Sequence, residues 1–113
     1  MYTTFKRNGG IIFMDKKAVI KIVENYANEI KKDFSPKKIY LYGSFAKGHA
    51  TEDSDIDVAL VYDEFNKDYL NSLTELYRIR RNFDTRIEPV ILESKYDPTG
   101  FLQHVINTGI EIM

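Results

Sequence analysis

The segment Ile56–Tyr62 reads Ile-Asp-Val-Ala-Leu-Val-Tyr, and it limits how this chain can fold more than any other segment does. Its apolar residues are nearly continuous rather than alternating, which is typical of a strand with both faces buried. We therefore expect this strand to lie in the centre of a sheet. The chain has 113 residues and no cysteine, so its core must form without disulfides or thiolate metal sites.

Two further strands and three helices complete the pattern. The strands are predicted at Lys38–Tyr42 and Arg86–Leu92, and Pro89 places the second of these at a sheet edge or a bulge. Apolar spacing predicts helices over residues 15–35, 67–83 and 98–109, followed by an apolar tail at residues 110–113. With a helical turn after Gly43-Ser44, the order is α-β-α-β-α-β-α, which predicts an α/β (α+β) fold with helices flanking a small sheet.

The predicted helices have start signals and inward faces of their own. Asp15 and Asn66 are expected to cap the first and second helices, and Pro98 is expected to open the third. In the last helix we expect four apolar residues to face the core: Phe101, Leu102, Val105 and Ile106.

Composition excludes several classes of protein. The chain is 43% hydrophobic and 29% charged, as expected of an ordinary globular domain, and its net charge of −1 argues against direct binding of nucleic acid. It lacks the roughly 18 consecutive apolar residues of a membrane-spanning helix. The apolar run at residues 11–14 is too short for a signal peptide. We expect a cytoplasmic protein with a flexible leader at residues 1–14, one domain at residues 15–113, and Met14 as an alternative start of translation.

Six carboxylates and no basic residue lie between Glu52 and Glu64, and we expect them to form one local anionic site. Asp55 and Asp57 are two residues apart where a strand begins, so both side chains should point to one face. Two like charges this close require either a shared proton or a divalent cation. Oxygen ligands favour Mg²⁺, and the alternative is a polar strand start without a metal.

Gly43-Ser44 ends the strand that precedes these aspartates. Glycine lets the backbone turn sharply and approach a ligand, and a serine hydroxyl with the following amides can hold phosphate oxygens. A phosphate site beside a metal site is the arrangement that phosphoryl or nucleotidyl transfer needs.

These residues together resemble a known signature. The run Gly43–Gly48 is followed by five residues and then by Ser54–Ala59, and ten residues separate Ser44 from Asp55. This is similar to the GS-x10-DxD signature of the nucleotidyltransferase (DNA polymerase beta-like) superfamily. The chain length resembles that of the minimal nucleotidyltransferases, and the resemblance covers residues 15–113.

The resemblance implies a mixed sheet flanked by helices, with Asp55 and Asp57 binding two Mg²⁺ ions and Gly43 and Ser44 contacting a nucleoside triphosphate. It also implies a third carboxylate on a later strand, which helps to hold one metal ion and to activate the attacking hydroxyl. We assign that role to Glu88, the only acid inside the third predicted strand. The family usually has aspartate there, and the alternative is a solvated glutamate.

Other residues near the signature have weaker assignments. Lys47 stands where many relatives have arginine, so it either pairs with triphosphate oxygens or is a solvated loop lysine. Ser54 is expected to cap or orient Asp55. Neither His49 nor His104 has the second ligand that a metal cluster needs. An arginine group is expected to form a solvated helix face or, alternatively, a docking surface: Arg78, Arg80, Arg81 and Arg86. Candidates for a partner interface are Tyr69, Tyr77 and the tail Ile110–Met113.

The implied reaction is Mg²⁺-dependent transfer of AMP from ATP to a hydroxyl. By resemblance the acceptor is a tyrosine of a cognate HEPN-domain toxin, which would make the chain a protein adenylyltransferase, the antitoxin of a type VII toxin–antitoxin pair, in a hetero-oligomer with its target. Two alternatives stay open. One is an antitoxin that acts by binding and occlusion without catalysis, and the other is transfer to a small molecule such as an aminoglycoside.

Overall fold

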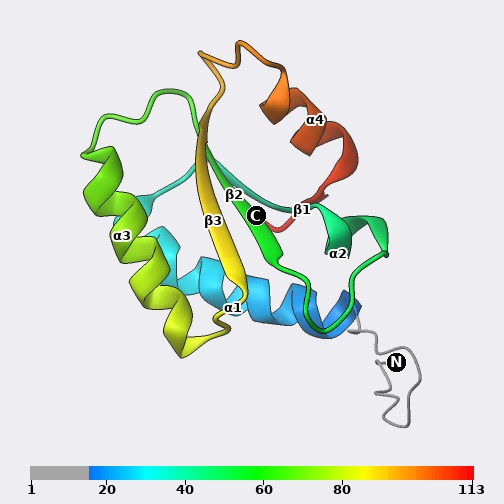
Figure 1. Cartoon of the computed structure of the whole chain (residues 1–113). Helices are drawn as coiled ribbons and strands as arrows, with labels where there is room; N and C mark the ends of the chain where they lie inside the picture. The colour runs from blue at the N-terminus through cyan, green and yellow to red at the C-terminus, as the bar shows by residue number, and fades with distance from the viewer. Residues whose placement is uncertain (1–15) are drawn as a thin grey trace, which may run out of the picture.

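The computed structural model describes residues 16–113, which form four helices, one 3-10 turn and a four-stranded sheet (Figure 1). In chain order the elements are α1 (Lys16–Phe34), β1 (Lys38–Tyr42), α2 (Ser44–Lys47), β2 (Ile56–Tyr62), α3 (Tyr69–Ile79), η1 (Arg80–Asn82), β3 (Ile87–Glu93), α4 (Phe101–Thr108) and β4 (Ile110–Glu111). The expected leader at residues 1–14 and the expected cap Asp15 lie outside the described residues, so both stay predictions. None of the described helices is long and apolar enough to cross a membrane.

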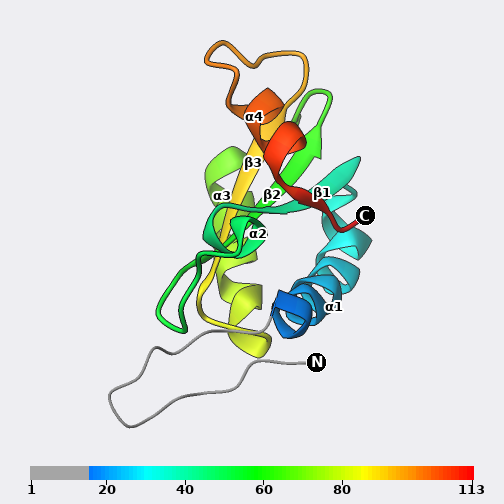
Figure 2. The same ribbon diagram turned by 90° about the vertical axis from the view of Figure 1, so that its right-hand side faces the viewer.

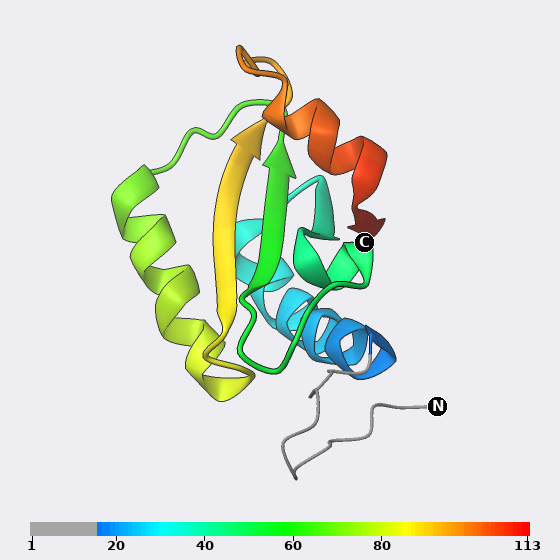
Figure 3. The ribbon, with the colours of Figure 1, turned by 45° about the vertical axis from the view of Figure 1, so that its right-hand side comes forward.

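The strand order is β3-β2-β1-β4, so β2 is central and β3 is an edge strand, as the continuous apolar run and Pro89 predicted. β1 runs antiparallel to β2, whereas β2 and β3 are parallel and joined by α3. Figure 3 shows β2 and β3 side by side, with α3 along the outer side of β3. This mixed sheet with flanking helices confirms the predicted α/β fold class.

β4 is an element that the sequence did not predict. The end of the chain was expected to be an apolar tail, but Ile110 and Glu111 pair antiparallel with Leu41 and Tyr40 of β1. The Ile39 amide then donates to the Met113 carbonyl at 2.8 Å. Figure 2 shows β4 beside β1. The tail is therefore part of the sheet, and its apolar side chains pack against the core instead of forming a free interface.

The two faces of the sheet have different coverings. Alternate residues of β2 (Ile56, Val58 and Leu60) are fully buried against α1 and α3. The intervening residues Ala59 and Val61 face the other way and pack with α4. Asp57 lies two residues before Ala59 in β2, and alternate residues of a strand point to the same face of the sheet. Its side chain therefore lies on the α4 face. In Figure 3 α4 lies beside the C-terminal ends of β2 and β3, away from the end where β2 begins.

The helix starts differ from those predicted. Asp68, not Asn66, caps α3, because its carboxylate accepts from the Asn71 amide at 3.0 Å. Pro98 does not open α4, which begins at Phe101 with the Asp97 carboxylate accepting from two amides of its first turn. Within α4 only Leu102 and Val105 are buried, whereas Phe101 and Ile106, both expected inside, are largely exposed. The helix is short and lies at the rim of the sheet, so it buries a narrow stripe.

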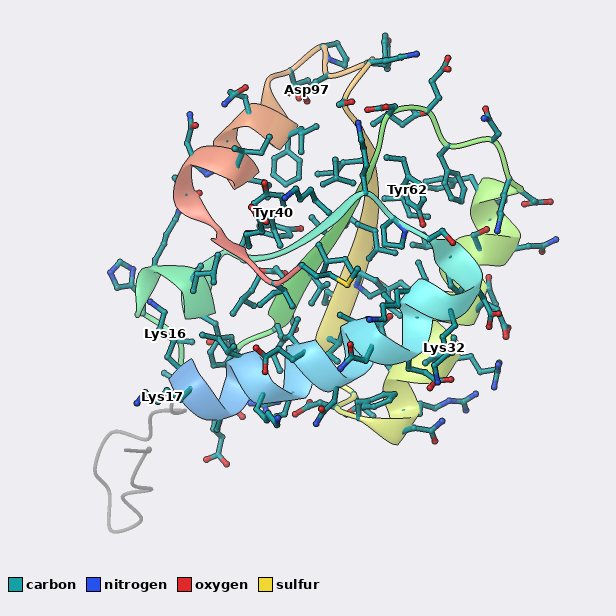
Figure 4. All side chains as sticks on the ribbon, turned by 180° about the vertical axis from the view of Figure 1, so that it is seen from behind. Lys16, Lys17, Lys32, Tyr40, Tyr62 and Asp97 are labelled. Atoms are coloured by element: carbon teal, nitrogen blue, oxygen red, sulfur yellow. The ribbon has the colours of Figure 1, made fainter. Side chains whose placement is uncertain are left out.

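Two tyrosines tie the helices to the sheet. The buried Tyr26 of α1 donates through its hydroxyl to the Leu76 carbonyl of α3 at 2.8 Å. Tyr62, at the end of β2, donates to the Phe34 carbonyl at 2.7 Å, and Figure 4 shows it near the C-terminal end of α1. These bonds fix α1 and α3 on one face and leave the opposite face available for a site.

Candidate active site

Strand pairing brings the three candidate acids together. Asp57 lies opposite Tyr42 of β1 on one side and opposite Glu88 of β3 on the other. Asp55 precedes β2 by one residue and shares the parity of Asp57, so both point to the α4 face. Glu88 has the parity of Val90 and Leu92, which pack on that same face. The structure therefore places Asp55, Asp57 and Glu88 at one end of the open face.

Gly43 lies directly against Asp57. The backbone at Gly43 has φ 77° and ψ −147°, a conformation open to glycine but strained for other residues. A β-carbon added at position 43 would overlap the Oδ2 atom of Asp57. Both the turn and the close approach therefore require glycine, which is the backbone property that the sequence predicted here.

Burial and repulsion make Asp57 unusual among the acids of this protein. Burial, together with the negative charges of Asp55 and Glu88, raises the pKa of Asp57 to about 6. Neither Asp55 nor Asp57 forms an ion pair within the described residues. Burial and the charge of Asp57 also raise the pKa of the adjacent Tyr42 to about 12. The site is thus a concentration of negative charge without an internal cation at the two aspartates.

Glu88 has partners that sequence reasoning missed. Its Oε1 atom accepts from the Tyr77 hydroxyl at 2.8 Å, and its Oε2 atom accepts from Nη1 of Arg80 at 3.3 Å. The predictions had Glu88 as a ligand or a solvated glutamate, Tyr77 at a partner interface and Arg80 on a solvated helix face. The contacts join the end of α3 to β3, and no short-range sequence signal reports them.

Arg86 holds the loop that carries Asp55. Its guanidinium pairs with Asp84 at 2.7 Å and donates to the Glu52 carbonyl at 2.9 Å, while its own carbonyl accepts from the Ile56 amide. The predicted arginine group is therefore divided. Arg78 and Arg81 are exposed, whereas Arg80 and Arg86 are mostly buried and support the site.

Ser44 and Lys47 are the first and last residues of the short α2, and both are exposed. Both are close in sequence to Gly43 and lie at the end of β1 that meets Asp57. Their contact with a triphosphate stays a prediction. Ser54 acts differently from expected, because its Oγ atom accepts from the Thr51 amide and closes a turn, with no contact to Asp55.

The run of six acids is not one site. Asp63 and Glu64 follow the far end of β2, eight and nine residues after Asp55, and both have cationic partners there. The expectation of one anionic cluster was wrong because a strand separates residues at its two ends. The local charge at the site comes from Asp55, Asp57 and the neighbouring Glu88.

The donor set suits a hard divalent cation. Carboxylate oxygens are the ligands that Mg²⁺ prefers, and the repulsion that raises the pKa of Asp57 would be relieved by a cation. Within residues 16–113 no three His, Cys, Asp or Glu side chains converge as a ready-made metal site. The absence of such a cluster agrees with the hydrogen bonds that the two Glu88 oxygens accept from Tyr77 and Arg80. The two aspartates fit the metal, and Glu88 is the adjoining third acid.

The sequence is similar to known proteins along most of its length. Residues 24–113 match the family model described as "Polymerase beta, Nucleotidyltransferase". A Methanocaldococcus jannaschii protein named "Putative protein adenylyltransferase" is 28% identical over 100 residues, which cover 83% of this chain and 98% of that protein. The match spans nearly the whole of that relative.

Solved structures show the same fold. A nucleotidyltransferase structure from Sulfolobus solfataricus superposes with a TM-score of 0.62 at 17% identity, covering 85% of this chain and 80% of that one. A structure described as a toxin–antitoxin with AMP-PNP superposes with a TM-score of 0.61 at 27% identity, covering 80% and 72%. The first likeness concerns the fold alone, and the second also associates the fold with a nucleotide analogue and a protein partner.

Proposed function

Because the chain belongs to the polymerase beta-type nucleotidyltransferase family, we propose that it transfers AMP from ATP to a hydroxyl group of a partner protein. The acceptor hydroxyl attacks the α-phosphorus in line, the bond to the β,γ-phosphates breaks, and pyrophosphate leaves. We further propose that the acceptor is a tyrosine of a cognate HEPN-domain toxin, so that the protein is the antitoxin of the pair.

One observation carries the proposal. Asp57, without an ion-pair partner among the described residues, lies against the glycine turn that ends β1 and opposite Glu88 of β3. A phosphate-approach turn and a cation-binding carboxylate are thereby in direct contact. Nucleotidyl transfer requires this proximity, because its catalysis consists mainly of positioning and charge neutralisation.

Each residue has a proposed role. Asp55 and Asp57 would hold Mg²⁺, which when bound neutralises charge on the triphosphate and on the leaving pyrophosphate. Gly43 allows the phosphates to approach the backbone, and Ser44 offers a hydroxyl to a phosphate oxygen. Glu88 would help to hold one Mg²⁺ ion, and it supplies a carboxylate beside the attacking hydroxyl, where it can accept the proton. Lys47 is assigned only a point charge near the triphosphate.

The choice of a protein acceptor rests on two observations. The elements of the fold take up most of residues 16–113, so few described residues are left over to enclose a small acceptor. Relatives and neighbours also point this way, since one relative carries a protein adenylyltransferase name and one neighbour is a toxin–antitoxin complex. A small acceptor such as an aminoglycoside lacks comparable support.

The test uses ATP labelled at the α-phosphate, Mg²⁺ and the protein encoded beside this one. We expect label on the partner, and mass spectrometry should place AMP on a tyrosine. Asp55→Asn should remove the label while leaving the circular dichroism spectrum and complex formation unchanged. A tight complex without label would instead establish occlusion. Label transferred from the γ-phosphate but not the α-phosphate would refute nucleotidyl transfer altogether.

A further inference from the structure

Glu88 is the one acid of the site whose carboxylate is held by other side chains. Tyr77 and Arg80, at the end of α3 and the start of η1, engage one oxygen each, at 2.8 and 3.3 Å. The other two acids, Asp55 and Asp57, have no side-chain hydrogen bond within the described residues. The structure therefore treats the third acid differently from the first two.

Arg80 is itself firmly held. Its Nη1 atom also donates to the Ile87 carbonyl at 2.7 Å, and its guanidinium lies 4.6 Å from the centre of the Tyr77 ring. The side chain is 23% exposed, and its Nε atom is buried without a hydrogen-bond partner. An unpaired buried donor is costly, so the contacts at Nη1 and at the ring must outweigh that cost. Tyr77 and Arg80 thus form a rigid pair.

A glutamate at this position needs such a pair. Its side chain is one methylene longer than those of Asp55 and Asp57, and a free glutamate loses rotamer entropy when its carboxylate is fixed. Tyr77 and Arg80 fix both oxygens in advance. An ionised carboxylate can accept about four hydrogen bonds or metal contacts, so each Glu88 oxygen keeps capacity for a cation or a proton.

We infer that Tyr77 and Arg80 are positioning residues that fix Glu88 as the third acid of the site. The inference rests on the role proposed above for Glu88. Partners behind a metal ligand typically change metal affinity or activity about 10- to 100-fold when they are removed. Tyr77 and Arg80 also line an open hollow of ≈ 370 Å³ with Arg78, Arg81 and Thr74. Arg81 of this hollow therefore provides a control whose side chain donates to the Arg78 carbonyl and not to Glu88.

The experiment measures Mn²⁺ affinity by electron paramagnetic resonance, with AMP-PNP held at saturation. Tyr77→Phe removes only the hydroxyl and should weaken Mn²⁺ binding about 10-fold. Arg80→Lys should weaken it by a smaller factor, because lysine keeps the positive charge near Glu88 but loses the planar guanidinium and its contact with the Tyr77 ring. The matched controls Tyr69→Phe and Arg81→Lys should stay within twofold, since Tyr69 is half-exposed and Arg81 does not contact Glu88.

A double-mutant cycle separates positioning from a general structural role. In a Glu88→Gln background, Tyr77→Phe should have no further effect on Mn²⁺ affinity, because its target carboxylate is already gone. An equal loss in both backgrounds would overturn the inference, as would an affinity of Tyr77→Phe within twofold of that of the unaltered protein. An affinity that rises in Tyr77→Phe would also overturn it, because it would mean that the pair withholds Glu88 from the metal.

The readout is independent of the acceptor. If the protein binds Mn²⁺ with AMP-PNP and shows the predicted cycle but labels no partner, the proposed acceptor is wrong and the positioning role stands. If it transfers AMP but Tyr77→Phe and Arg80→Lys match their controls, the proposed function stands and the positioning role is wrong.

Discussion

The two ends of β2 carry the same kind of residue in opposite settings. At the far end, Asp63 accepts from the Lys37 ammonium at 3.0 Å and from the Ser94 hydroxyl at 2.9 Å, and these bonds lower its pKa. Glu64 nearby pairs with Lys95 at 3.6 Å. Within residues 16–113, Asp55 and Asp57 at the near end have no such partner, and the pKa of Asp57 is raised to about 6.

We infer from this contrast that the number of acids in a stretch of sequence does not identify a metal site. The partners of each carboxylate in the fold distinguish a carboxylate with a structural role from a proposed metal ligand. Both pairs of acids lie in one acidic run of the sequence, but β2 separates them, so each pair has different neighbours in the fold. A carboxylate that lies far from other negative charges and is already paired with an ammonium gains little from Mg²⁺, whereas one that is half-buried beside other negative charges is stabilised by a cation.

The largest expected effect comes from exchanging aspartate for asparagine at each end. Asp57→Asn should lower AMP transfer on the order of 10³-fold or more, because it removes a metal-binding charge. Its melting temperature without metal should be equal or higher at pH 8, since a buried, repelled charge is lost. The matched variant Asp63→Asn should keep transfer within twofold and show a slightly lower melting temperature. Equal activities in the two variants would contradict the assignment of the site to the near end.

A second pair of variants separates backbone strain from crowding of Asp57. Gly43 and Gly48 both have a positive φ, 77° and 81°, but a β-carbon at Gly48 meets nothing within 4 Å. Both alanine variants should lose about 1–2 kcal/mol of stability through strain. Only Gly43→Ala should also lower AMP transfer, about 100-fold, because it displaces the Asp57 carboxylate. Denaturant unfolding and single-turnover transfer measure the two effects, and similar activity in both variants would show that the close approach does not matter.

A smaller effect concerns pH. Asp57 has a pKa of about 6 in the folded protein against an ordinary value of 3.8, so the folded protein binds this proton more tightly than the unfolded chain. The resulting stability is complete below pH 3.8 and is lost as the pH rises through about 6. The metal-free protein should therefore melt at a lower temperature at pH 8 than at pH 5, and the stabilisation by Mg²⁺ should be greater at pH 8.

The aspartates at the two ends of β2 should change the stability of the fold in opposite directions as the pH rises. Asp63 has a lowered pKa, so its contribution is lost as the pH falls, and Asp63→Asn should leave the decrease in stability between pH 5 and pH 8 in place. Asp57→Asn should remove most of that decrease. Differential scanning fluorimetry across this range would show it, and identical profiles for the unaltered protein and Asp57→Asn would exclude Asp57 as its source.

Much of the fold was predictable because its signals are local. The continuous apolar run placed β2 in the centre, and Pro89 placed β3 at an edge. The helix predicted over residues 15–35 ends at Phe34, two residues before Pro36, since a residue before proline avoids helical geometry. β4 was missed because a strand of two residues has no periodicity of its own and exists only by pairing with β1.

Some features of the site were likewise predictable from local sequence and others were not. The glycine turn at Gly43 and its closeness to Asp57 followed from residue types and spacing, which reflect backbone requirements. The contacts of Glu88 with Tyr77 and Arg80 did not, because they form only when α3 packs beside β3. The pairing of Lys37 with Asp63 likewise joins residues 26 positions apart. Tertiary packing therefore decided which acids are paired.

The smallest expected effect concerns the end of β2 away from the site, to which we assign a structural role only. Ser35 follows α1 with φ 45°, a left-handed conformation that disfavours a β-carbon, and its amide donates to the Lys31 carbonyl at 3.1 Å. Ser35→Gly should stabilise the fold by roughly 0.5 kcal/mol, the relief of strain exceeding the entropy that glycine adds to the unfolded chain. Ser35→Ala keeps the β-carbon and should bring no gain. Urea unfolding measures both, and AMP transfer should stay within twofold. A change in transfer would mean that the far end is coupled to the site, and the separation of the two ends of β2 would then fail.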